Sequence, residues 1–85
     1  MAKFQSSETR LIAVTGTDKK EHFGSLCKHV VLVADANCFV AFDENADTGS
    51  LLIVANQPYD FPVQFTEIHA ITSGGTANLY IMALR

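Results

Sequence analysis

The chain is a series of short apolar runs, each closed by turn-forming or polar residues. The runs span residues 9–15, 26–34, 38–43, 51–55, 61–65, 68–73 and 76–84. The run 26–34 is rich in the β-branched residues that suit a pleated sheet, and no segment sustains helical periodicity. The pattern predicts an all-β fold, a small single-domain antiparallel β-sandwich or jelly roll of about seven to eight strands.

The expected domain takes up residues 1–85, and residues 1–8 form a polar N-terminal arm. Residues 17–25 and 44–50 are expected to be polar loops. Pro62 cannot donate a backbone hydrogen bond, so its strand is expected to lie at an edge, or to begin near this residue.

Two adjacent glycines, Gly74 and Gly75, predict a β-hairpin, because glycine accepts the positive φ of a two-residue turn. Counting back from this turn places Ala70 opposite Leu79 and Ile68 opposite Ile81. These four residues would form one apolar face of the hairpin, whereas the other face is mixed.

A second hairpin is expected around the Asp35-Ala36-Asn37 turn, with Ala34 opposite Cys38. One face of this hairpin pairs Leu32 with Val40 and is suited to the core. The opposite face is apolar as well, and consists of Val31, Val33, Phe39 and Ala41. We expect this second face to be covered, either by a loop of the same chain or by another subunit.

The composition favours a covering subunit. Hydrophobic residues make up 48% of the 85 residues and charged residues only 18%, which is more apolar surface than a small domain hides easily. No run approaches the ~20 apolar residues of a membrane-spanning helix, and the N-terminus lacks the apolar core of a secretory signal. The net charge of −3 and six scattered basic residues exclude a nucleic-acid surface. Self-association into a homo-oligomer is therefore expected.

No constellation for catalysis, metal or cofactor binding is found. The three histidines lack the close ligand spacing of zinc sites; Cys27 and His29, two positions apart, are the nearest approach to it. Both cysteines lie in apolar runs, where a thiol is inert, so no enzyme is expected. The expected hairpin separates Cys27 from the residue opposite Cys38 by roughly 23 Å, which excludes a bond between them and leaves one between subunits open.

The strand pattern over residues 29–42, 52–58, 59–63 and 68–81 resembles that of small tailed-bacteriophage virion proteins of β-sandwich or jelly-roll type. The resemblance implies a capsid decoration (cement) protein that stabilises the assembled head. It would sit on the capsid surface after assembly in the host cytoplasm, as a homo-oligomer, expected to be a trimer, bound to the major capsid protein. A neck, tail or fibre-attachment protein is the near alternative. A carbohydrate-binding jelly roll with an exposed Tyr59 is the other.

Overall fold

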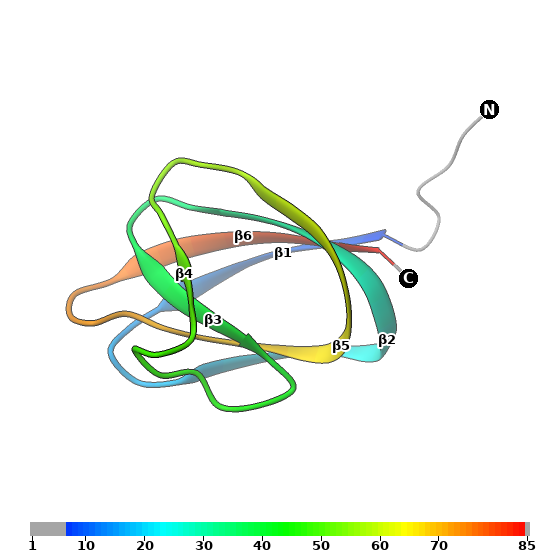
Figure 1. Ribbon diagram of the computed structural model, residues 1–85, viewed down its shortest axis with the longest axis horizontal. Coiled ribbons are helices and arrows are strands. Elements are labelled where there is room, and N and C mark those ends of the chain that lie inside the picture. Colours follow the sequence, from blue (N-terminus) through cyan, green and yellow to red (C-terminus); the bar gives the residue numbers. More distant parts are fainter. Residues whose placement is uncertain (1–6, 85) are drawn as a thin grey trace.

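The computed structural model describes residues 7–84, and every regular element among them is a β-strand (Figure 1). The strands are β1 (Ser7–Val14), β2 (Lys19–Ala34), β3 (Cys38–Phe42), β4 (Leu51–Ile53), β5 (Tyr59–Ile71) and β6 (Ala77–Leu84). They form one antiparallel sheet in the order β1-β6-β2-β5-β3-β4. The all-β, single-domain class is confirmed, and no helix among the described residues could cross a membrane.

The described part of the chain has six strands because two expected runs, 61–65 and 68–73, belong to the single long strand β5. Strand β2 likewise begins at Lys19, inside the segment that was expected to be a loop. Of the expected N-terminal arm, Ser7 and Glu8 belong to β1, where they pair with Leu84 and Ala83. The rest of that arm lies outside the described residues.

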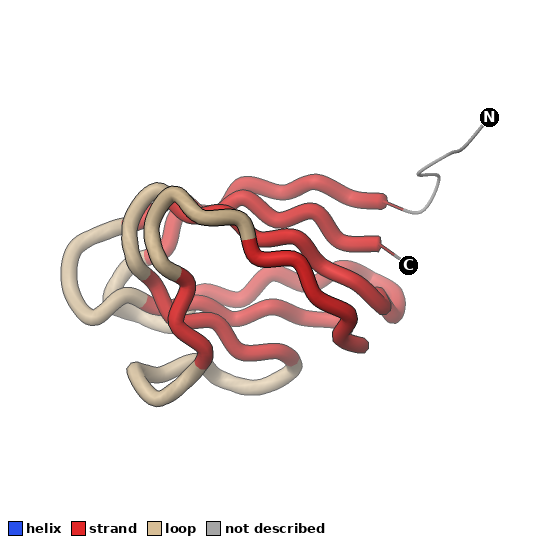
Figure 2. The backbone as a smooth tube through the Cα atoms, turned by 45° about the horizontal axis from the view of Figure 1, so that its top comes forward, coloured by secondary structure: helices blue, strands red, loops and turns tan. Residues whose placement is uncertain are grey.

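The continuous sheet folds over itself into two layers (Figure 2). Layer A contains β1, β6, residues 29–34 of β2 and residues 59–62 of β5. Layer B contains β4, β3, residues 67–71 of β5 and residues 19–22 of β2. The paired strands β2 and β5 run through both layers, so the fold is a β-sandwich whose two sheets share one bent ribbon. Pro62 lies on β5 where this strand is the edge of layer A, as expected.

The ribbon bends where the β2–β5 register shifts on either side of Cys27. Gly24 lies in this stretch with φ of +79°, a conformation that only glycine adopts without strain. On the inside of the bend, the rings of Phe23 and Phe65 meet edge to face with centroids 5.7 Å apart. Phe42 packs on Phe65 at 5.2 Å. An aromatic cluster thus fills the inside of the bend.

The core lies between the layers and takes alternate residues from each strand. Layer A contributes Ile12, Val14, Val30, Leu32, Leu79 and Ile81, and layer B contributes Cys38, Val40, Ile53, Ile68 and Ala70, all almost completely buried. The guanidinium of Arg10 lies 4.8 Å from the ring centre of Phe23 and pairs with Glu21. Arg10 therefore links β1 of layer A to the β2 segment of layer B at the end where the ribbon bends.

The expected hairpin at residues 35–37 is wrong. Strand β2 pairs with β5 and β6, whereas β3 pairs with β4 and β5, so the turn carries the chain from layer A to layer B. Its polar side chains bond to residues distant in the sequence instead of to each other. Asp35 accepts hydrogen bonds from the backbone and side-chain amides of Asn78, at 2.7 and 2.9 Å. The amide oxygen of Asn37 accepts the N–H of Ala55 at 2.8 Å.

The expected β-hairpin at residues 74–75 is also wrong, although the turn itself is present. Gly75 has φ of +82°, and the hydroxyl of Thr72 donates to the carbonyl of Gly75 at 2.9 Å. The chain then crosses from β5 in layer B to β6, which pairs with β1 and β2 in layer A. Ile68 and Ile81 therefore belong to opposite layers of the core and are not partners in one ladder.

The bend at Gly24 predicts that alanine destabilises the protein at this position but not at Gly16. Neither Gly16 nor Gly24 has an atom close to the position of an added Cβ, but only Gly24 has a positive φ. We expect Gly24→Ala to lower the free energy of unfolding by about 1–2 kcal/mol, because an L-residue is strained in that conformation. Gly16→Ala should cause no such loss in chemical denaturation. Equal effects of the two substitutions would contradict this account of the bend.

Candidate functional site

The outer face of layer A is apolar and uncovered by any described part of the chain. Leu11, Tyr80 and Met82 project from it with 58%, 48% and 41% of their surface exposed, and Val31 and Val33 are half-buried between them. The register explains the grouping. Across the three strands, Leu11 lies beside Tyr80 and Tyr80 beside Val33, and Met82 lies beside Val31. We call these five residues the layer A face.

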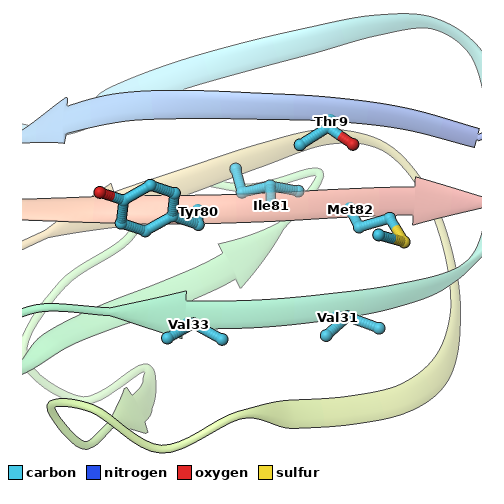
Figure 3. Close-up of a pocket in the computed structure, with 6 residues that line it drawn as sticks. All are labelled: Thr9, Val31, Val33, Tyr80, Ile81 and Met82. Atoms are coloured by element: carbon cyan, nitrogen blue, oxygen red, sulfur yellow. The ribbon is translucent and has the colours of Figure 1, made fainter.

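A hollow of about 160 Å³ opens on this face between the side chains of Tyr80 and Met82 (Figure 3). Val31 and Val33 line one side of it and Thr9 the other, and Ile81 forms its floor. Leu11, two positions along β1 from Thr9, is the most exposed large apolar residue in the described part of the chain. The face therefore carries both a hollow and a protruding apolar side chain.

Polar groups surround the apolar centre of the layer A face, and they include Thr9 beside Met82 and Asp60 beside Val31. At one end the imidazole of His29 pairs with the carboxylate of Asp60. At the other end Asp35 accepts the two hydrogen bonds from Asn78. An apolar centre bounded by polar residues is the arrangement found in protein–protein interfaces.

The outer face of layer B is partly covered by the chain itself. Residues 43–50 form a loop near this face, and Ala46 of the loop is only 6% exposed. The N–H of Ala46 donates to Oδ1 of Asp18 at 2.9 Å. Oδ2 of Asp18 is 2.8 Å from Nδ1 of His69, which pairs in register with Ala41. What stays half-buried or exposed on this side is a smaller group, Phe39, Leu52 and Ile71, which we call the β3–β4 patch.

The four residues predicted to form one interface therefore divide between two surfaces. Val31 and Val33 lie on the layer A face, which is open, whereas Phe39 and Ala41 lie on the outside of layer B. Ala41 is only 5% exposed and is not available to a partner, which corrects the prediction for this residue. The sequence reasoning missed Leu11, Tyr80 and Met82. The signal was present, since Tyr80 and Met82 alternate with Leu79 and Ile81 in the stretch 79–84, which contains no charged residue.

His69 is the centre of a buried polar cluster, and its imidazole is held by carboxylates at both ring nitrogens. Asp18 lies 2.8 Å from Nδ1 and Glu67 lies 3.1 Å from Nε2. Burial by itself would lower the pKa of His69, but the hydrogen bonds to Asp18 and Glu67 outweigh it and raise this pKa above its ordinary value. Burial likewise opposes the ionisation of Asp18, yet the hydrogen bonds from His69 and Ala46 lower the pKa of Asp18.

Asp43 fixes the start of the same loop. One carboxylate oxygen of Asp43 accepts hydrogen bonds from the backbone N–H of Thr66 and of Glu67, at 2.9 and 2.8 Å. The hydroxyl of Thr66 donates to it as well, at 3.0 Å. Slight burial works against ionisation, but these hydrogen bonds prevail and lower the pKa of Asp43. The cluster around His69 and Asp43 thus anchors the loop through charged groups.

This cluster does not have the arrangement of a catalytic site. A general base needs a ring nitrogen free to accept a proton from a nucleophile, and both nitrogens of His69 face carboxylates. Among residues 7–84 no group of three or more potential ligands is arranged to hold a metal ion. Cys27 and His29 belong to different environments, because the register shifts between them and Cys27 is buried whereas His29 pairs with Asp60.

Tyr59, the residue considered for sugar stacking, has a structural role. Its ring packs against the core, and its hydroxyl oxygen accepts the N–H of Val54 at 3.1 Å. The ring of Tyr59 is therefore half-buried, which does not favour a sugar-binding platform.

Comparison of the chain with models of protein families, with curated proteins and with solved structures finds no match in any of the three. The interpretation of the surface therefore depends on its geometry and on the strand pattern of the sequence.

The charged cluster predicts how stability depends on pH. A raised pKa means that folded His69 binds its proton more tightly, so this stabilisation is complete below the ordinary value of 6.5 and is lost as the pH rises through the raised value. The lowered pKa values of Asp18 and Asp43 act in the opposite sense. Their stabilisation is present above the ordinary value of 3.8 and is lost as the pH falls through the lowered values.

We expect urea unfolding to give a lower free energy of unfolding at about pH 9 than at about pH 6. In His69→Gln this difference should shrink, because the titrating ring is gone while a side-chain donor remains. A wild-type protein that is equally stable at the two pH values would contradict the proposed role of the cluster.

The two cysteines are expected to be unreactive in the folded protein. Cys27 and Cys38 are both free and buried, which confirms that they are not bonded to each other, although the hairpin register used to exclude the bond was wrong. Burial, followed by the nearby charge of Asp35, raises the pKa of Cys38 to about 11. We expect a thiol reagent near neutral pH to modify neither cysteine until the protein unfolds, and a reducing agent to leave the melting temperature unchanged. Recovery of a linked Cys27–Cys38 peptide would contradict the structure.

Proposed function

We propose that the protein is a structural protein of a tailed-bacteriophage virion, a capsid decoration protein that binds and stabilises the assembled head. It acts by covering apolar surface, without catalysis, metal or cofactor. Its partners are further copies of itself and the major capsid protein.

One observation carries this proposal: large apolar side chains project from both layers of the sandwich. Leu11, Tyr80 and Met82 protrude from layer A, and Leu52, 42% exposed, protrudes from layer B. Contiguous exposed apolar patches mark interaction surfaces. Because the two patches lie on opposite sides of the sandwich, the domain is suited to contact two partners at once.

The strand pattern supports a virion as the setting, since it resembles that of small tailed-phage virion proteins. A decoration protein needs a rigid scaffold with more than one adhesive surface, and a sandwich with a filled core is rigid. Its effect on the shell follows from linkage: a protein that binds only the assembled shell stabilises that shell by its binding free energy.

The proposal is tested on particles of the virus or prophage whose genome encodes the chain. We expect mass spectrometry of purified particles to detect the protein, and antibody labelling to place it on the head. Particles that lack the protein should lose their DNA at a lower temperature, and addition of purified protein should restore the wild-type value.

If antibodies label the neck, tail or fibres instead of the head, the protein is a neck, tail or fibre-attachment protein and not a capsid decoration protein. Absence of the protein from purified particles would refute a virion function altogether.

A further inference from the structure

We infer that the layer A face is the contact surface for a second copy of this chain, related by a two-fold axis that lies in the plane of the interface. The inference deepens the proposed function, on which it rests for the biological role of the contact, and it replaces the trimer that the resemblance implied by a two-fold dimer. It assigns one of the two apolar patches to self-association, and leaves the β3–β4 patch for a different partner.

The shape of the face is self-complementary. The hollow of about 160 Å³ is close to the size of cavity that accepts one large apolar group. Leu11, exposed by 58%, stands beside the hollow on the same face. A two-fold axis midway between them, in the plane of the interface, would place each Leu11 side chain over the hollow of the partner. Both contacts of such a pair are made by the same residues, as a two-fold interface requires.

The area of the face is sufficient for a weak dimer. The strands of layer A are spaced about 4.8 Å apart, and β1 and β6 contribute eight residues each, with residues 29–34 of β2 and 59–62 of β5 beside them, which gives a face of roughly 400 Å². Two copies packed face to face would then remove about 800 Å² from water, an area in the range of weak, transient interfaces. Stacked sheets about 10 Å apart are also a common way of packing β-structure.

The electrostatics of the face permit this contact. The five residues of the layer A face carry no formal charge, so packing two copies together would not bury an unpaired charge. The charged side chain of Asp60 lies beside Val31 at the β5 edge of the face, and it already pairs with His29 of the same chain. Asp35 is likewise satisfied by Asn78.

The chain offers a matched pair of variants for the test. Met82 on the layer A face and Leu52 in the β3–β4 patch are 41% and 42% exposed. Substitution by glutamate places the same charge on either surface without disturbing the core. We expect analytical ultracentrifugation at about 100 μM, well above a micromolar dissociation constant, to show a dimer for wild type and for Leu52→Glu. Met82→Glu should be a monomer with the wild-type circular dichroism spectrum, as should Leu11→Glu.

Several results would overturn the inference: a monomeric wild type, a dimeric Met82→Glu, or loss of association in Leu52→Glu. Loss of association in both variants would mean that two different patches meet head to tail. These outcomes concern the isolated protein, so they are independent of whether the chain is found in particles. If the isolated protein is a monomer and antibodies still locate it on the phage head, the dimer is refuted and the proposed function is supported.

A disulfide test reports the symmetry directly. In a chain carrying Leu11→Cys and Val31→Cys, β6 separates the two new thiols by about 10 Å, too far for a bond within one chain. The native cysteines are buried. Mild oxidation should produce a covalent dimer and nothing larger, because a two-fold contact closes on itself. A ladder of higher species, or monomer alone, would contradict the two-fold contact.

Discussion

The long antiparallel pairing of β2 with β5 is the constraint on which the rest of the structure depends. These two strands stay hydrogen-bonded while they pass from one layer to the other, so a single ribbon supplies strands to both sheets of the sandwich. The ribbon can turn because Gly24 accepts a positive φ and the register shifts around Cys27. The aromatic cluster of Phe23, Phe42 and Phe65 fills the inside of the bend.

This architecture determines which surfaces are available. Each layer has one face in the core and one face outside. Among residues 7–84 the longest loop, residues 43–50, covers part of one outer face. The hydrogen bond from Ala46 to Asp18, and those from the backbone N–H groups of Thr66 and Glu67 to the carboxylate of Asp43, anchor that loop on layer B. The described residues provide no equivalent cover for layer A, and its apolar side chains remain in solvent.

Titratable side chains inside the molecule are engaged by other groups of the fold, whereas large apolar side chains lie on its surface. Its one buried histidine is held between two carboxylates, and its thiols are buried, the pKa of Cys38 being raised to about 11. Apolar surface that water would otherwise surround favours association in proportion to the area covered. Patches on opposite sides would let one small domain join a copy of itself to another protein, which is the property that a shell-stabilising protein needs.

The sequence by itself determined which residues of each strand share a face. Successive residues along a strand point to opposite sides, so Val31 was expected to share a face with Val33, and Leu79 with Ile81, whichever strands lay beside them. It also located the turns near Asp35 and Gly75, and the apolar surplus that leaves Val31 and Val33 outside the core. Only the tertiary structure decided which strands are neighbours, because an alternating pattern fits any partner. Asp35 and Asn37 bond to Asn78 and Ala55 across the fold instead of closing a hairpin. This pairing of strands separates Val33 from Phe39 and leaves Ala41 covered. It also brings Leu11 of β1 together with Tyr80 and Met82 of β6 on one face.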